Sequence, residues 1–115
     1  MLIFKRGVRA SGLKEEMLVA LDVATDVFSR LEKDCIVTSA RGDKHGDHSH
    51  HYKGHAVDLR RKHLDSDQQA KILLIDLEND LGPGYQVVLE SDHFHIEYDP
   101  RSVDLMWRYK TTRSA

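Results

Sequence analysis

The sequence has little cysteine, little proline and no long apolar run: it contains one Cys and two Pro. The single cysteine, Cys35, cannot form a disulfide within the chain, so the fold must be stable without one. No apolar stretch approaches the roughly 20 residues of a membrane-spanning helix, so we expect no membrane partner. Proline-rich, serine-rich and repeated segments are also missing, which excludes collagen-like and disordered chains.

A strong charge of one sign is missing as well. Lys and Arg number 17 and Asp and Glu 19, which gives a net charge of −2. Proteins that bind nucleic acid usually carry a large positive field, so we expect no nucleic-acid partner. The first residues, Met-Leu-Ile-Phe-Lys-Arg-Gly, carry charge too early for the apolar segment of a secretory signal peptide. We therefore expect a soluble chain without an export signal, cytoplasmic as synthesised.

Chain length limits the organisation to one domain. In 115 residues, two separate cores would each be too small to bury enough surface for stability. We expect a single domain over residues 1–115. Residues 100–115 combine basic side chains with Met106, Trp107 and Tyr109, and they fit either a short helix on the domain surface or a peripheral tail.

Two segments show the three- and four-residue apolar spacing of an amphipathic helix. The first covers residues 13–31, with Ser11 as its expected N-cap. The second follows Ser66 and Gln69, which are spaced as a capping box, and ends at Gly82-Pro83. A domain of this size must bury both apolar stripes, so we expect both helices to pack on the core.

Four short segments with β-branched or alternating residues predict strands, at residues 35–39, 56–60, 85–89 and 93–98. The last two are close enough to form a hairpin. The expected fold class is therefore α+β, an antiparallel sheet flanked by two helices. In the last strand, alternation places apolar side chains on one face and polar ones on the other. These are Phe94, Ile96 and Tyr98 against His93, His95 and Glu97.

Histidine is the residue in excess. Five of the eight histidines fall within eleven positions: His45, His48, His50, His51 and His55. Zinc binds imidazole nitrogen and carboxylate oxygen, and a catalytic zinc keeps one position open beside three protein ligands. His51, Asp58 and His95 could form such a site if their strands are neighbours. No HExxH helix is present, which excludes a zincin-type arrangement.

Residues 49–58, Ser-His-His-Tyr-Lys-Gly-His-Ala-Val-Asp, contain the pattern Ser-x-His-x-x-Gly-x-Ala-x-Asp. In this pattern the chain resembles the M15 family of zinc D-Ala-D-Ala carboxypeptidases and dipeptidases, and their relative, the hedgehog signalling domain. Residues 38–41 and 92–97 resemble that family's flanking motifs, so the resemblance spans residues 38–98. It implies a hedgehog/DD-peptidase-like fold, one Zn²⁺ ion, and zinc ligation by His51, Asp58 and His95.

The third ligand and the general base each have alternatives. In the family a carboxylate lies three residues before the last zinc histidine, which makes Asp92 the first candidate for the base. A His-x-His pair in related murein endopeptidases and in hedgehog uses its second histidine as ligand, which favours His95 and leaves His93 as an auxiliary base or oxyanion donor. The family's Glu-x-Trp-His pattern gives another register, with His93 as ligand and Glu90 as base, but this chain lacks the tryptophan.

The resemblance also implies substrate contacts. Arg41 matches the family's arginine that contacts substrate and stabilises the oxyanion, and Ser49 is placed to hydrogen bond substrate. Glu97 either orients a zinc ligand or forms a surface ion pair.

The expected function is zinc-dependent hydrolysis of a peptide bond next to a D-amino acid in peptidoglycan, by a D-Ala-D-Ala carboxypeptidase-like enzyme or a murein endopeptidase. The missing export signal fits a phage or prophage protein that acts on the cell wall. The alternative is a non-catalytic, zinc-stabilised binding or virion structural domain. The sequence leaves the oligomeric state and the bond cleaved open.

Overall fold

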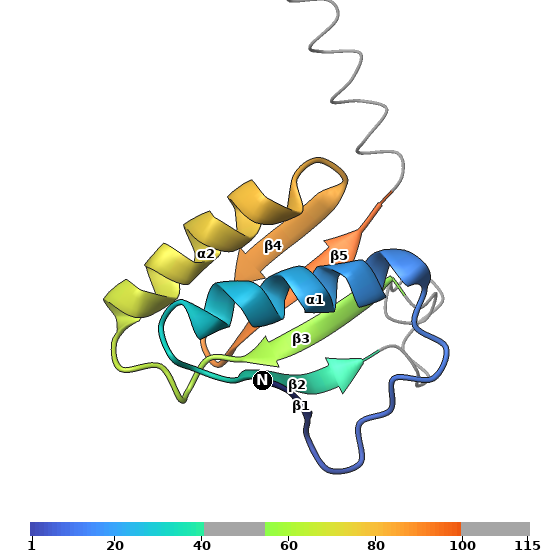
Figure 1. Cartoon of the computed structure of the whole chain (residues 1–115), viewed down its shortest axis with the longest axis horizontal. Coiled ribbons are helices and arrows are strands. Elements are labelled where there is room, and N and C mark those ends of the chain that lie inside the picture. The colour runs from blue at the N-terminus through green and yellow to red at the C-terminus, as the bar shows by residue number, and fades with distance from the viewer. Residues whose placement is uncertain (41–54, 100–115) are drawn as a thin grey trace, which may run out of the picture.

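The computed structural model describes residues 1–40 and 55–99 of the chain. This part of the chain forms an α+β fold in which two helices lie on one face of a five-stranded sheet (Figure 1). The elements in chain order are β1 (Leu2–Phe4), α1 (Glu15–Ser29), β2 (Cys35–Ala40), β3 (Ala56–Arg60), α2 (Asp67–Leu81), β4 (Tyr85–Leu89) and β5 (His93–Tyr98). The four strands and two helices expected from the sequence are all present, within two residues of most predicted ends.

The sheet is mixed, so the expectation of an antiparallel sheet is only partly right. Its strand order is β1-β2-β3-β5-β4. The pairs β2–β3, β3–β5 and β4–β5 are antiparallel, whereas β1 runs parallel to β2. The crossover from β1 to β2 passes through α1, which is the usual way to join parallel neighbours. β1 has only three residues, too few for an alternating pattern that would predict a strand.

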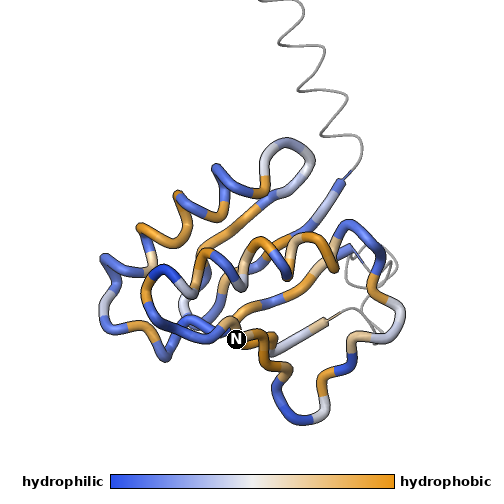
Figure 2. Tube along the Cα trace, viewed as in Figure 1, coloured by the Kyte–Doolittle hydropathy of each residue, from blue (hydrophilic) through white to orange (hydrophobic). Residues whose placement is uncertain are grey.

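The core lies between the helices and the sheet. On the two central strands the side chains that face the helices are Val57, Leu59, Phe94 and Ile96, and each is 0% exposed. Phe28 of α1 meets Phe94 edge-on, with ring centroids 6.0 Å apart. Figure 2 shows the matching apolar stripes along both helices. The opposite sheet face, called the open face below, carries the intervening side chains of β3 and β5.

The two helices begin differently. Ser66 caps α2 as predicted: its Oγ accepts a hydrogen bond from the Gln69 N–H at 3.1 Å, and the Gln69 side chain accepts one from the Asp65 N–H at 2.9 Å. The predicted Ser11 cap of α1 is wrong. The cap position is Lys14, whose side chain makes no capping bond, because residues 11–12 form a turn that separates Ser11 from the helix.

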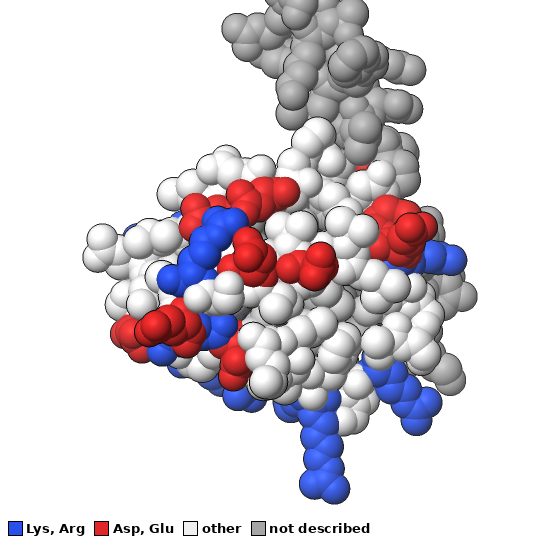
Figure 3. Space-filling view, in the orientation of Figure 1, with Lys and Arg blue, Asp and Glu red and all other residues white. Residues whose placement is uncertain are grey.

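A single arginine links the two helices by pairing with acidic side chains of both. Arg30, just after α1, pairs with Asp26 of its own helix and with Asp76 and Asp80 of α2. Figure 3 shows acidic side chains gathered over the two helices. No helix within the described ranges combines the length and apolarity needed to cross a membrane.

Candidate metal site

The pairing of β3 with β5 brings two of the predicted zinc ligands together. Asp58 and His95 are direct cross-strand partners, and both point to the open face because Val57, Leu59, Phe94 and Ile96 fill the other one. The Nδ1 of His95 lies 2.8 Å from Oδ1 of Asp58. Their side chains are about four-fifths buried, at 21% and 19% exposure. A carboxylate and an imidazole from distant sequence segments therefore share one small volume.

Glu97 holds the other side of the His95 ring. Its Oε1 lies 3.2 Å from Nε2 of His95, and its side chain is 18% exposed. The hydrogen bond to Asp58 is the main cause that raises the pKa of His95, and the two nearby carboxylates outweigh the opposite effect of burial. The ring is thus fixed at both nitrogens. Both roles considered for Glu97, orienting a metal ligand and forming an ion pair, are compatible with this contact.

His93 lies beside the Asp58–His95 pair and is oriented by the neighbouring aspartate. Its Nε2 is 3.7 Å from Oδ1 of Asp58, and its Nδ1 is 2.6 Å from Oδ1 of Asp92. The hydrogen bond to His93 lowers the pKa of the Asp92 carboxyl. Asp92 therefore contacts the site through the imidazole of His93, a pairing that sequence reasoning did not predict.

Glu90 faces His93 across the tight turn between β4 and β5. The Glu90 N–H donates to the His93 carbonyl at 2.8 Å, which makes the two residues a hydrogen-bonded cross-strand pair. Directly paired residues project to the same face of a sheet, so Glu90 stands on the open face with His93 and His95. Both alternative base residues are therefore at this end of the site.

Three predicted site residues, Arg41, Ser49 and His51, lie outside the described residues. Within residues 1–40 and 55–99 there is no group of three or more His, Cys, Asp or Glu side chains arranged to hold a metal ion. The described part of the chain thus supplies two of the three expected ligands, Asp58 and His95. Their donor types, one carboxylate oxygen and one imidazole nitrogen, are those that zinc accepts.

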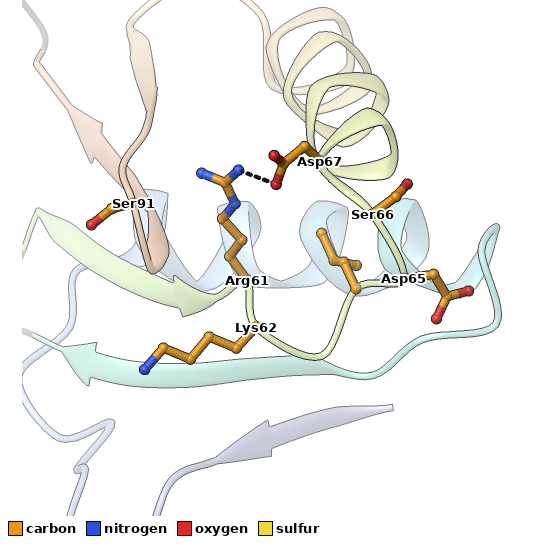
Figure 4. A pocket seen from close by; sticks show the side chains of 7 residues that line it. Arg61, Lys62, Asp65, Ser66, Asp67 and Ser91 are labelled. Atoms are coloured by element: carbon orange, nitrogen blue, oxygen red, sulfur yellow. Dashed lines mark hydrogen bonds and ion pairs between the residues drawn. The ribbon is translucent and has the colours of Figure 1, made fainter.

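A polar cavity of about 290 Å³ lies at the end of β3, next to the β4–β5 turn. It is lined by Arg61, Lys62, Leu64, Asp65, Ser66, Asp67 and Ser91 (Figure 4). The Arg61 guanidinium is held by the Asp67 carboxylate at 2.9 Å and by the Glu90 carbonyl at 2.6 Å. The sequence analysis did not predict this cavity. The one signal for it is the adjacent pair Arg61 and Lys62 between β3 and α2. Its arginine fixes the turn that carries Asp92.

Comparison of the chain with protein-family models, with curated proteins and with solved structures found no match.

Proposed function

We propose that this chain is a zinc-dependent peptidase of hedgehog/DD-peptidase-like fold that hydrolyses a peptide bond next to a D-amino acid in peptidoglycan. The observation that supports the proposal best is the 2.8 Å contact of Asp58 with His95 on neighbouring strands. The sequence pattern predicts both residues as ligands, although they are 37 positions apart. His51 completes the proposed ligand set.

The two described ligands suit zinc by their chemistry and their support. Ligands of one metal ion lie close together, and a ligating histidine usually donates its second ring N–H to a carboxylate. His95 meets both conditions, because Asp58 is at one ring nitrogen and Glu97 at the other. In this arrangement Nδ1 of His95 would hold the ion and its Nε2–H would donate to Glu97. The paired register of β3 and β5 favours His95 over His93 as ligand.

The remaining residues act on protons and on the substrate. When bound, zinc supplies a Lewis acid that polarises the scissile carbonyl and makes water a better nucleophile. His93 accepts a proton at Nε2, the nitrogen that faces Asp58, because Asp92 holds its Nδ1. Asp92, the first candidate for the base, then works through His93, and Glu90 remains the alternative. Arg41 and Ser49 are proposed to bind the substrate.

The test separates the ligand from the base. We expect purified protein to bind about one equivalent of zinc and to release amino groups from purified peptidoglycan. His95→Gln should weaken zinc binding at least about 100-fold, because a ligand is lost. His93→Gln should retain zinc and lower the cleavage rate by about 100-fold or more, the usual contribution of a general base. Metal content is measured by elemental analysis and cleavage by amino-group release.

The controls distinguish the alternatives. Asp22→Asn, which changes an exposed acidic residue of α1, should alter neither zinc binding nor cleavage. Loss of zinc in His93→Gln but not in His95→Gln would establish the other register. Zinc binding without cleavage by any preparation would favour the zinc-stabilised structural domain. Cleavage that persists in EDTA would exclude the metal mechanism.

We also propose that the protein is of phage or prophage origin and acts on the cell wall. Comparing its activity on isolated peptidoglycan with its activity on whole cells distinguishes the ability to cleave from the ability to reach the wall. We expect cleavage of isolated peptidoglycan by the protein added from outside, and no effect on intact cells whose wall lies behind an outer membrane. Lysis of such intact cells by the protein alone would contradict this view.

A further inference from the structure

One edge of the sheet is formed by β4, so one side of its backbone has no neighbouring strand in the described sheet (Figure 1). In the β4–β5 ladder, the Glu90 N–H donates to the His93 carbonyl and the Asp99 N–H donates to the Gly84 carbonyl. Hydrogen-bonded pairs alternate along an antiparallel ladder. The backbone groups of Gln86 and Val88 consequently face β5 as well, and those of the intervening residues face outward.

The outward residues are Tyr85, Val87 and Leu89. Within residues 1–40 and 55–99, no group forms a hydrogen bond with their backbone N–H or C=O. Their side chains are only partly buried, whereas Ile96 and Phe94, the β5 partners of Val87 and Leu89, are 0% exposed. Val88, on the open face of the same strand, is 43% exposed. Among the described residues, the edge therefore presents both unused hydrogen-bonding groups and accessible apolar surface.

This edge lacks the features that usually prevent strand pairing. Exposed edge strands are commonly blunted by charge, proline, a bulge or short length. The β4 sequence Tyr-Gln-Val-Val-Leu has no charged residue and no proline, and its register with β5 is regular over five pairs. The opposite edge strand, β1, has only three residues and is followed at once by Lys5 and Arg6. Pairing is thus favoured at β4 over β1.

We propose that a second copy of this chain pairs with β4, antiparallel and centred on Val87, so that two sheets join into one. The outward residues are symmetric about Val87, so the N–H and C=O groups of Tyr85 match those of Leu89 in the second copy. A twofold contact needs such a self-complementary patch. An extended peptide of another protein could satisfy the same backbone groups, but the uncharged side chains of β4 match one another in the antiparallel register, which favours the second copy.

The side chains are compatible with this pairing. On the helix face, Val87 meets Val87 of the second copy and Tyr85 meets Leu89, so partly buried apolar side chains become covered. On the open face, Gln86 lies opposite Val88. Glu90 lies opposite Gly84. Like charges directly opposite each other would weaken strand pairing, and this register places none there. Because the twofold axis runs perpendicular to the sheet, both candidate metal sites face the same side.

Concentration-dependent hydrogen exchange of the full chain tests the proposal directly. We expect sedimentation to show a monomer–dimer equilibrium. The amides of Tyr85, Val87 and Leu89 should gain protection as the protein concentration rises, whereas those of Gln86 and Val88 should be protected at every concentration. This alternation is specific to pairing at the β4 edge. A chain that remains monomeric at the highest concentration reached, with the odd-numbered amides exchanging freely, overturns the proposal.

Two variants complete the test. Val88→Lys adds a charge to an exposed position of the edge and should weaken dimerisation at least tenfold. Val19→Lys, at a more exposed position of α1 (51% against 43%), should leave dimerisation unchanged. Val87→Pro removes an outward N–H without removing a β4–β5 hydrogen bond, and it should abolish the dimer. A dimer that survives both β4 changes uses another surface and contradicts the proposal. The outcome is independent of zinc binding and cleavage.

Discussion

At Asp58, a single carboxylate oxygen faces two imidazoles. Oδ1 lies 2.8 Å from Nδ1 of His95 and 3.7 Å from Nε2 of His93. The flanking carboxylates of Glu97 and Asp92 hold the outer nitrogen of each ring. His95 is thus hydrogen bonded at both ring nitrogens, and His93 is held at Nδ1 by Asp92. Such fixed orientation is what a metal ligand and a proton acceptor require.

Cys35 shows the opposite situation, a reactive group made inert by its surroundings. Its thiol is 0% exposed, and burial raises its pKa from 9.0 to about 12. The thiolate is the reactive form, so we expect iodoacetamide to leave native protein unmodified at pH 8 and to modify it in urea. Rapid alkylation of native protein would show that Cys35 is accessible.

The same shift predicts how stability depends on pH. Because the folded pKa lies above the unfolded one, the contribution of the thiol to the free energy of unfolding is complete below pH 9 and declines as the pH rises toward about 12. Urea unfolding at pH 8 and pH 10 measures this decline. Cys35→Val, which keeps an apolar side chain in β2, should show a smaller loss between the two pH values. An equal loss in both proteins would assign the pH dependence to other groups.

At the scale of the element, the two helices differ in whether a side chain caps the first turn, so comparing them shows how much such a cap contributes to stability. α2 begins with two capping bonds, from the Gln69 N–H to Ser66 Oγ and from the Asp65 N–H to the Gln69 side chain, whereas α1 begins at Lys14 without a capping bond. The difference follows from sequence: an N-cap must lie directly before the first helical turn. Ser66 does, but Ser11 is separated from α1 by a turn.

Ser66→Ala should lower the free energy of unfolding by about 1 kcal/mol, because the Gln69 N–H loses its acceptor. Lys14→Ala changes the equivalent position of α1 and should cost no more than about 0.5 kcal/mol, as at other surface positions. Urea denaturation of both variants against the unchanged chain gives the comparison. Equal costs at the two positions would mean that the Ser66 side chain does not stabilise α2.

At the scale of the whole molecule, the core and the candidate site share one strand. Phe94 fills the helix face of β5 against Phe28, and the residues on either side of it, His93 and His95, form the site on the open face. Packing on one face of β5 therefore sets the position of the candidate ligand, His95, on the other.

Phe94→Ala should destabilise the domain by about 3–5 kcal/mol through the cavity it leaves. Ile75→Ala, at a side chain of α2 that is 56% exposed, should change stability by no more than about 0.5 kcal/mol. Urea unfolding followed by circular dichroism measures both. A Phe94→Ala cost near that of Ile75→Ala would indicate that β5 is not anchored in a common core.

Most of the described elements could be predicted from local sequence because their signals are short in range. Apolar spacing located both helices, and alternation assigned Phe94 and His95 to opposite faces, as the burial confirms. β1 was missed because three residues give no period. Its parallel pairing was missed too, because strand direction depends on the connection through α1.

What the sequence determined by itself is the set of candidate groups: the histidines and carboxylates of a metal-site pattern, the faces of the strands and the cap of α2. These follow from residue type and spacing. What only the tertiary structure decided is which groups meet. The β3–β5 register joins Asp58 to His95, the β4–β5 turn places Asp92 on His93, and strand order leaves β4 at an edge. Strand order and register arise from packing between segments distant in sequence, which no local pattern encodes.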